Sequence, residues 1–412
     1  MPGATPIPRG PTVLTLYTAT DLLTGPGCPV CRYADEAADR YLAWFALEGH
    51  ADSVTVTRLC ASLGMCPRHT RGLMSQPGAD RRLTALYRYL IRAARGRLAG
   101  RVARPSGCPA CDHDDGAAGR ALDTLLDGLA DGRVRDRYRE LGGLCIPHLR
   151  AASARGDQRI LSWLAQAMTA VVSAGSASPG WLAGTDRDAD TRAVLRNALP
   201  TSLLPGSGAC AACLAAGRAE HARLARIAGS DGSAGLLDPR LLLCAGHLSD
   251  RIVLAGQPAV PSLLAWQAGS LAAALICPRP SPPSRASWLR FRRRGAGLDA
   301  CPVCLDTEAA AERVLGDLRR QLRSARSAPG QLTPLCVRHL LSLKAADPWA
   351  GQVAAIDAIA RADLLIAELD HAFTNATWAH CHQARGPEMT AWRRAAAFLD
   401  GDVFCGCPPR SG

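Results

Sequence analysis

The 412-residue chain is poor in lysine and in aromatic residues, and it lacks a long uninterrupted apolar run. A single lysine, Lys344, accompanies 47 arginines, and Phe, Trp and Tyr make up 5% of the residues. The longest apolar run, residues 261–277, is interrupted by polar residues and is shorter than the roughly 20 residues that a membrane-spanning helix needs. Residues 1–27 lack the charged start and apolar core of a secretory signal. We therefore expect a cytoplasmic protein without a transmembrane segment.

Sequence motifs of common enzyme classes are also missing. The chain contains no phosphate-binding loop, no dinucleotide-binding glycine motif, no G-x-S-x-G elbow and no H-E-x-x-H metalloprotease motif. No segment alternates apolar and polar residues over the length of a strand, whereas several segments repeat apolar residues at helical spacing. The sequence therefore favours an all-α protein that is not an enzyme.

Seventeen cysteines are the most informative residues that the chain does contain. Thiols stay reduced in the cytoplasm, so clustered cysteines there indicate metal sites rather than disulfides. Twelve of the seventeen follow one pattern, which occurs four times: C-x-x-C and, 31 to 35 residues later, C-x-x-H. The four copies are Cys28, Cys31, Cys66 and His69; Cys108, Cys111, Cys145 and His148; Cys210, Cys213, Cys244 and His247; and Cys301, Cys304, Cys336 and His339.

Three thiolates and one imidazole complete the closed, tetrahedral ligand set of a structural zinc ion. We therefore predict about four zinc ions, each held by the two half-sites of one copy. A catalytic zinc keeps one position for water and has three protein ligands, so closed sites argue against zinc catalysis. Each filled site contributes three thiolates and one divalent ion, which lowers the formal charge of the chain from +12 to about +8.

Two redox chemistries could use the same residues. An iron–sulfur cluster also accepts thiolate and imidazole ligands. A thiol–disulfide pair also occurs as C-x-x-C at the start of a helix, where the thiol pKa is lowered, although such a pair needs no C-x-x-H partner. An iron–sulfur or thiol redox protein is therefore the alternative to a zinc-stabilised scaffold.

Segments with helical apolar spacing accompany the half-sites, for example residues 41–45 and 83–91 in the first copy. In the fourth copy, the predicted apolar face is Val353, Ile356, Ile359, Leu365 and Leu369. We predict an all-α fold of four tandem helical units of about 70 residues, each stapled by its own Cys3His site. The expected division is an N-terminal tail, 1–27; unit 1, 28–97; unit 2, 108–174; a linker, 175–209; unit 3, 210–277; a basic linker, 278–300; unit 4, 301–371; and a C-terminal tail, 372–412.

Three copies of the first half-site read C-P-V-C or C-P-A-C, and an apolar residue precedes the third cysteine in all four copies. These half-sites resemble those of a family of uncharacterised bacterial helical proteins with zinc-finger-like C-P-x-C and L-C-x-x-H half-sites. The resemblance implies metal binding and an all-α fold, and it implies no reaction. The third copy departs from the family's pattern, because Ala211 stands where the other copies have proline.

A further Cys/His cluster lies in the C-terminal tail. His380, Cys381 and His382 precede Cys405 and Cys407 by about 25 residues. These residues predict either a fifth metal site or an exposed, oxidisable Cys-Gly-Cys end. A metal held there by only three ligands would suit catalysis, so a metalloenzyme, or an accessory protein to an enzyme, is a further alternative function.

The basic linker is the strongest candidate for contact with a polyanion. Its arginines stand among Trp288 and Phe291 without any acidic residue, so they could bind phosphates while the rings stack on bases or insert into an anionic membrane surface. A solvated linker is the plain alternative, and an unknown protein is the partner we expect first. The candidate contacts are Arg279, Arg285, Arg290, Arg292, Arg293 and Arg294.

Several cysteines and histidines stand outside the repeated pattern. His113 follows Cys111 by two residues, so it is an alternative ligand in place of His148. Residues without a counterpart in the other copies are predicted to be structural rather than ligating. They are the core residues Cys60 and Cys277 and the surface or hydrogen-bonded histidines His50, His221 and His371.

Overall fold

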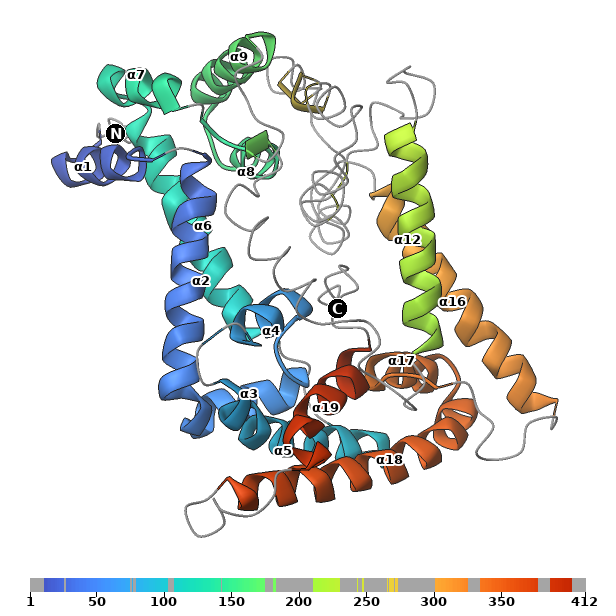
Figure 1. Cartoon of the computed structure of the whole chain (residues 1–412). Helices are drawn as coiled ribbons and strands as arrows, with labels where there is room; N and C mark the ends of the chain where they lie inside the picture. Colours follow the sequence, from blue (N-terminus) through green and yellow to red (C-terminus); the bar gives the residue numbers. More distant parts are fainter. Residues whose placement is uncertain are drawn as a thin grey trace, which may run out of the picture. The chain divides into compact units, whose positions relative to one another are not determined.

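A computed structural model shows the protein as a set of helices (Figure 1). The structure describes residues 11–25, 27–74, 76, 79–102, 107–141, 143–174, 181–182, 210–229, 243, 247, 265, 267–269, 271–272, 301–324, 334–376 and 386–401. These ranges contain helices and no strand, which confirms the all-α prediction. None of the helices described is both long and apolar enough to cross a bilayer.

The chain divides into two compact bodies, each assembled from three separate segments. Body 1 comprises Met1–Ala37, Asp114–Asp190 and Ile227–Ala300, and body 2 comprises Ala38–His113, Thr191–Arg226 and Cys301–Gly412. Neither body is a run of consecutive predicted units, because each takes pieces of several. The division of the sequence into four tandem units stays a prediction.

Body 1 contains α1, the start of α2, most of α6, and α7 to α9. These helices are α1 (Val13–Leu22), α2 (Pro29–Leu47), α6 (Pro109–Gly128), α7 (Gly132–Leu141), α8 (Ile146–Ser153) and α9 (Gln158–Ser173). Small residues let α1 and α6 approach closely: a Cβ atom on Gly128 would lie 2.4 Å from Cβ of the buried Ala19. Helices α6 and α9 each bury an apolar face, with Leu125 and Leu164 fully enclosed.

Body 2 contains the remaining helices. They are the 3-10 helices η1 (Gly49–Ala51) and η5 (Pro387–Thr390), with α3 (Ser53–Ser62), α4 (Pro67–Met74), α5 (Ala79–Leu98), α12 (Ala211–Gly229, through Arg226), α16 (Pro302–Arg323), α17 (Val337–Ala346), α18 (Pro348–Asn375) and α19 (Ala391–Asp400). Helix α5 contacts α3, α18 and α19, and its predicted apolar face, including Leu90 and Ile91, is buried. The chain's single lysine links α17 to the end of α5, since Lys344 Nζ donates to the Leu98 carbonyl at 3.0 Å.

Helix α18 buries most of the face that the sequence predicted, with one exception. Leu365 and Leu369 are buried, and Val353 and Ile359 pack against the core, but Ile356 is 64% exposed. The rest of the buried face consists mainly of alanines, because the helices pack closely: a Cβ atom on Gly351 would lie 2.3 Å from Cα of Lys344 in α17. Small side chains permit this approach, and the prediction did not include them.

Ion pairs between α5 and α18 are expected to contribute modestly to stability. Arg88 Nε and Arg92 Nη2 lie 2.6 and 2.7 Å from the Asp370 carboxylate. Burial raises the pKa of Asp370, but the hydrogen bonds from both arginines outweigh it, so the pKa is lowered. The stabilisation is therefore present above the unfolded pKa of about 3.9 and is lost as pH falls through the folded value.

Asp370→Asn should thus lower the free energy of unfolding by about 0.5–1 kcal/mol at pH 7, a value limited by solvent screening at this partly exposed pair. Urea titration followed by circular dichroism measures the change. Asp136→Asn is the matched control, because its partner Arg139 is a neighbour on the same exposed helical surface. Equal effects of the two substitutions would contradict a specific role for the interhelical pairs.

Candidate metal centres

Each half-site that the structure describes lies at the start of a helix. The carbonyl of its first cysteine accepts the backbone N–H four residues later, at 2.8–3.3 Å, in Cys28, Cys66, Cys108, Cys145, Cys210, Cys301 and Cys336. The sulfurs of Cys145 and Cys336 do not cap these helices, and they point into a cluster of side chains. The positive end of a helix favours thiolate over thiol, so this position prepares the cysteines for a cation.

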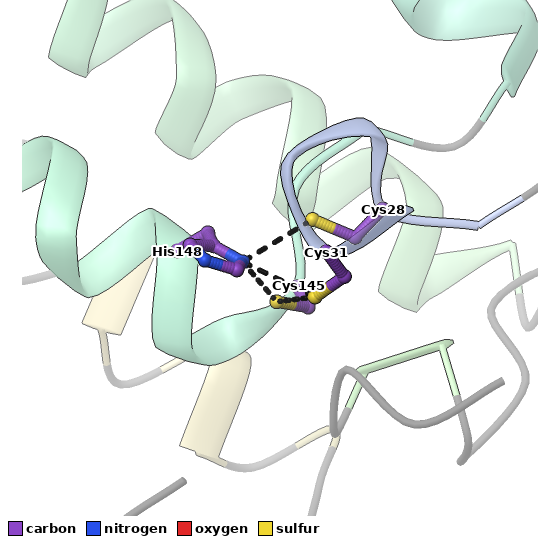
Figure 2. A group of neighbouring side chains, drawn as sticks. All are labelled: Cys28, Cys31, Cys145 and His148. Carbon is purple, nitrogen blue, oxygen red and sulfur yellow. Dashed lines mark hydrogen bonds between the residues drawn. The ribbon is translucent and has the colours of Figure 1, made fainter. Parts of the chain in front are cut away.

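Group A brings together Cys28, Cys31, Cys145 and His148 (Figure 2). The sulfurs of Cys28, Cys31 and Cys145 lie 3.5, 3.2 and 3.2 Å from His148 Nδ1, and those of Cys31 and Cys145 are 3.5 Å apart. Cys28 and Cys31 come from the start of α2, whereas Cys145 and His148 come from the start of α8. All four residues belong to body 1.

Group B brings together Cys66, His69, Cys108 and Cys111 in body 2. The sulfurs of Cys66, Cys108 and Cys111 lie 3.2, 3.6 and 3.4 Å from His69 Nδ1, and those of Cys66 and Cys111 are 3.6 Å apart. The first pair comes from the start of α4 and the second from the start of α6. Cys66 and His69 are buried in this group, whereas Cys108 and Cys111 are half-buried.

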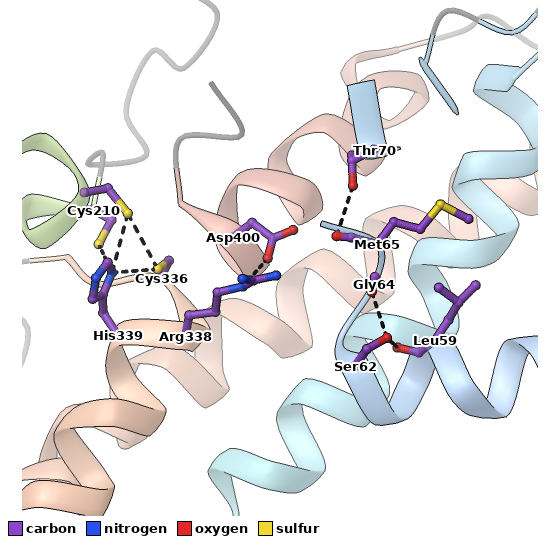
Figure 3. Close-up of polar contacts among 11 residues, drawn as sticks. Leu59, Ser62, Gly64, Met65, Thr70, Cys210, Cys336, Arg338, His339 and Asp400 are labelled. Atoms are coloured by element: carbon purple, nitrogen blue, oxygen red, sulfur yellow. Dashed lines mark hydrogen bonds and ion pairs between the residues drawn. The ribbon is translucent and has the colours of Figure 1, made fainter. Parts of the chain in front are cut away.

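Group C brings together Cys210, Cys213, Cys336 and His339, also in body 2 (Figure 3). The three sulfurs lie 3.3, 3.4 and 3.2 Å from His339 Nδ1, and those of Cys213 and Cys336 are 3.9 Å apart. The group joins the start of α12 to the start of α17. The structure thus assembles a complete Cys3His set three times within the part of the chain that it describes.

These groups correct the predicted pairing of half-sites within each copy. Group A joins the C-x-x-C of the first copy to the C-x-x-H of the second, group B makes the reverse pairing, and group C joins the third copy to the fourth. The helices after these C-x-x-C half-sites, α2, α6 and α12, have 19, 20 and 19 residues. At 1.5 Å per residue, each carries the chain about 28–30 Å away from its own C-x-x-C half-site. The prediction ignored this length.

The geometry of the groups fits one tetrahedral ion each. Zinc bonds of about 2.3 Å to sulfur and about 2.0–2.1 Å to nitrogen place two sulfurs roughly 3.8 Å apart and a sulfur and a nitrogen roughly 3.6 Å apart. The groups show S–S separations of 3.5–3.9 Å and S–N separations of 3.2–3.6 Å. A disulfide would need about 2.05 Å between two sulfurs, and none of the described cysteines forms one.

Each group also stabilises a negative charge on the first sulfur of its C-x-x-C half-site. Hydrogen bonds from Cys111 and Cys66 lower the pKa of Cys108 to about 3. Burial raises the pKa of Cys28, but hydrogen bonds from Cys145 and Cys31 and the nearby His148 outweigh it and lower the pKa well below its usual range. The same kind of hydrogen bonding lowers the pKa of Cys210. A thiolate surrounded by further donors is the electrostatic setting that binds a cation.

Two glycines that the pattern did not include shape the entry to the C-x-x-H half-sites. Gly64 and Gly143 have positive φ angles of 110° and 88°, and each lies two residues before a half-site cysteine. A Cβ atom on Gly143 would lie 2.5 Å from the ring of Tyr138, whose hydroxyl accepts the Leu144 N–H at 2.8 Å. The spacing Gly-x-Cys in the first two copies is the sequence signal that could have revealed this turn.

The turn before group B is held by side-chain hydroxyls (Figure 3). Ser62 Oγ donates to the carbonyls of Leu59 and Gly64 at 3.2 and 2.8 Å. Thr70 Oγ1 donates to the Met65 carbonyl at 3.2 Å. These bonds satisfy the backbone where the chain leaves α3 and enters the half-site at the start of α4.

The other predicted ligands are only partly described. Cys301 and Cys304 of the fourth copy lie at the start of α16. His247 of the third copy is buried, and Cys244 of the same half-site lies outside the described residues. His113 does not replace His148, which completes group A; its ring stacks on Tyr41 at 4.3 Å. The following predicted residues lie outside the described ranges: His380, Cys381, His382, Cys405, Cys407, Cys277 and Arg279, Arg285, Arg290, Arg292, Arg293 and Arg294.

Comparisons with known proteins give no further assignment. No model of a protein family matches the chain, no curated protein matches its sequence significantly, and no solved structure matches it significantly. The resemblance to the bacterial helical family therefore stays a prediction. The capacity to bind metal rests on the three Cys3His groups of the structure.

Proposed function

We propose that this protein is a non-enzymatic zinc-binding scaffold in which structural ions join half-sites from different copies of the repeat. The observation that carries this proposal is the assembly of three complete Cys3His sets, with tetrahedral separations, from helix starts far apart in the sequence. The closed ligand sets favour a structural over a catalytic ion. Reduced thiols in this number suit a cytoplasmic setting.

A fourth ion completes the proposed pattern. Groups A and B exchange half-sites between the first and second copies, and group C uses one C-x-x-C from the third copy and one C-x-x-H from the fourth. The half-sites that remain, Cys244 with His247 and Cys301 with Cys304, again supply three cysteines and one histidine. We therefore keep the expectation of about four zinc ions per chain while changing the partners within each site.

A protein is the partner that we propose for this scaffold. Large apolar side chains remain exposed on α18, where Trp349, Ile356 and Leu364 are 54%, 64% and 68% accessible. Their spacing of seven and eight residues places them on one side of the helix. Such a stripe suits a protein surface better than a phosphate backbone. The basic linker, residues 278–300, supplies the alternative contact with nucleic acid.

Elemental analysis together with an absorbance spectrum tests the proposed metal. Purified full-length protein should contain about four zinc ions and be colourless, because zinc has a filled d shell. Iron with broad visible absorbance would instead identify an iron–sulfur protein. The short separations within each group favour a single ion, since a cluster spreads its ligands over several iron atoms. Protein without bound metal and with active disulfides would support the thiol redox alternative.

A further inference from the structure

The end of α19 lies against group C. Gly401, the residue that follows α19, has φ 75° and ψ −138°, and its N–H donates to the Ala397 carbonyl at 2.8 Å. A Cβ atom on Gly401 would lie 2.2 Å from Sγ of Cys213 and 3.4 Å from Sγ of Cys336. The backbone of Gly401 therefore occupies space beside two ligand sulfurs that no other residue type could share without a shift.

An ion pair fixes the same end of α19 to the half-site. Arg338 stands between Cys336 and His339 in the sequence, and its Nε lies 2.6 Å from Oδ1 of Asp400 (Figure 3). The Asp400 side chain is only 4% exposed, so this contact is shielded from solvent. The last residue of α19 and the first turn of α17 are thus tied together next to the ligands.

The rest of α19 is anchored in the core of body 2. Its buried face includes Trp392, Phe398 and Leu399, and the Trp392 ring lies 6.4 Å from that of Tyr87 in α5. Of the three complete groups in the described residues, group C is the one in which all three cysteines are buried. Groups A and B each retain at least one half-buried cysteine.

We propose that Gly401 is a positioning residue of group C and that the end of α19 covers this site. This inference rests on the proposed metal-binding function. Release of a Cys3His-bound ion requires a competing ligand to approach as a protein ligand leaves. The Gly401 backbone blocks that approach beside Cys213, and the Arg338–Asp400 pair holds the block in place. Occupancy of group C and docking of α19 therefore support each other, as thermodynamic linkage requires.

Gly401→Ala tests the cover, with Gly100→Ala as the matched control. Gly100 also has a positive φ, 100°, but a Cβ atom there would meet nothing within 4 Å. In zinc-loaded full-length protein mixed with a chromogenic chelator, we expect Gly401→Ala to release one ion about 10–100-fold faster than wild type, the usual range for lost support of a metal ligand. Gly100→Ala should leave every release rate unchanged, and Gly401→Ala should add nothing in a Cys213→Ser background, which lacks group C.

Hydrogen exchange of α19 provides a second measurement that does not depend on the stability of the Gly401 variant. Cys213→Ser should speed amide exchange in residues 391–401 at least about tenfold, whereas Cys31→Ser, which damages group A in body 1, should leave that segment protected. The proposed cover would be contradicted if Gly401→Ala released zinc at the wild-type rate. It would also be contradicted if this substitution accelerated zinc release equally from all sites. A wild-type chain without bound zinc would instead refute the proposed function.

Discussion

A chain carrying both Cys31→Ser and His148→Ala is expected to hold one metal ion fewer than wild type, the same loss as either single substitution. Both side chains belong to group A, with 3.2 Å between the Cys31 sulfur and His148 Nδ1, so the second substitution damages a site that the first has already removed. Combining Cys31→Ser with His69→Ala should cost two ions, because His69 belongs to group B. Pairing between copies and pairing within a copy therefore predict metal contents that differ by one ion per chain for each double variant.

Ion counts should be measured after dialysis against a chelator concentration that leaves the wild-type count unchanged, because three remaining ligands could retain a weakly bound ion. Cys60→Ser serves as the control, since Cys60 is half-buried and lies outside the three groups. Its ion count should equal that of wild type. The opposite pattern would support the pairing within each copy that the sequence first suggested. In that case Cys31→Ser would cost two ions when combined with His148→Ala and one ion when combined with His69→Ala.

Removal of all bound metal is expected to abolish most of the helical signal at 25 °C. Structural zinc sites contribute about 10–16 kcal/mol each in small zinc-binding peptides, whereas whole domains are stable by only about 5–15 kcal/mol. In body 1, group A is the one link of this kind that the structure describes between the start of α2 and the start of α8. Without the ion, the buried Cys28 would also keep a thiolate charge that burial disfavours, because its pKa lies well below the usual range.

Far-UV circular dichroism during titration with a strong chelator measures this loss, and zinc added in excess over the chelator should restore the signal. The same chelator already saturated with zinc controls for effects unrelated to metal removal. A metal-free chain that kept its helical signal and its melting temperature would show that the apolar cores suffice. Body 2 has the larger described apolar core, around α5 and α18, so its helices should be the last to unfold.

The sequence was sufficient to predict an all-α fold with Cys/His half-sites but not how the half-sites combine. Cys28 and Cys31 are recognisable because two sulfurs at this spacing can face one ion, and this property is local. The identity of the facing half-site depends on where α2 ends, which is a property of the tertiary structure. The sequence pattern indicated a helix between Cys31 and Cys66 but not its length, and α2 has 19 residues, about 28 Å.

One residue of the predicted α18 face, Ile356, was placed wrongly for a related reason. Large apolar side chains at helical spacing usually indicate the buried side, and Ile356 was placed there. Helix α18 instead buries alanines and Gly351 because it approaches α17 too closely for larger side chains. Gly401 was also invisible in the sequence, since a lone glycine after a helix is common and only the fold brings it beside Cys213.

The exchange of half-sites has a consequence for the order in which the protein is assembled during translation. The ligand set of group B is complete once Cys111 has been synthesised. Cys28 and Cys31 are synthesised earlier, but the ligand set of group A is complete only when His148 has been added. At about 5–20 residues per second, the roughly 117 residues that separate Cys31 from His148 take about 6–23 s to synthesise. Throughout that interval the two thiols are open to oxidation or to a wrong metal, and during its last 37 residues, from Cys111 to His148, the nascent chain also carries one finished site. Supply of the correct ion to the ribosome-bound chain, rather than to the completed protein, would then determine how much of it folds.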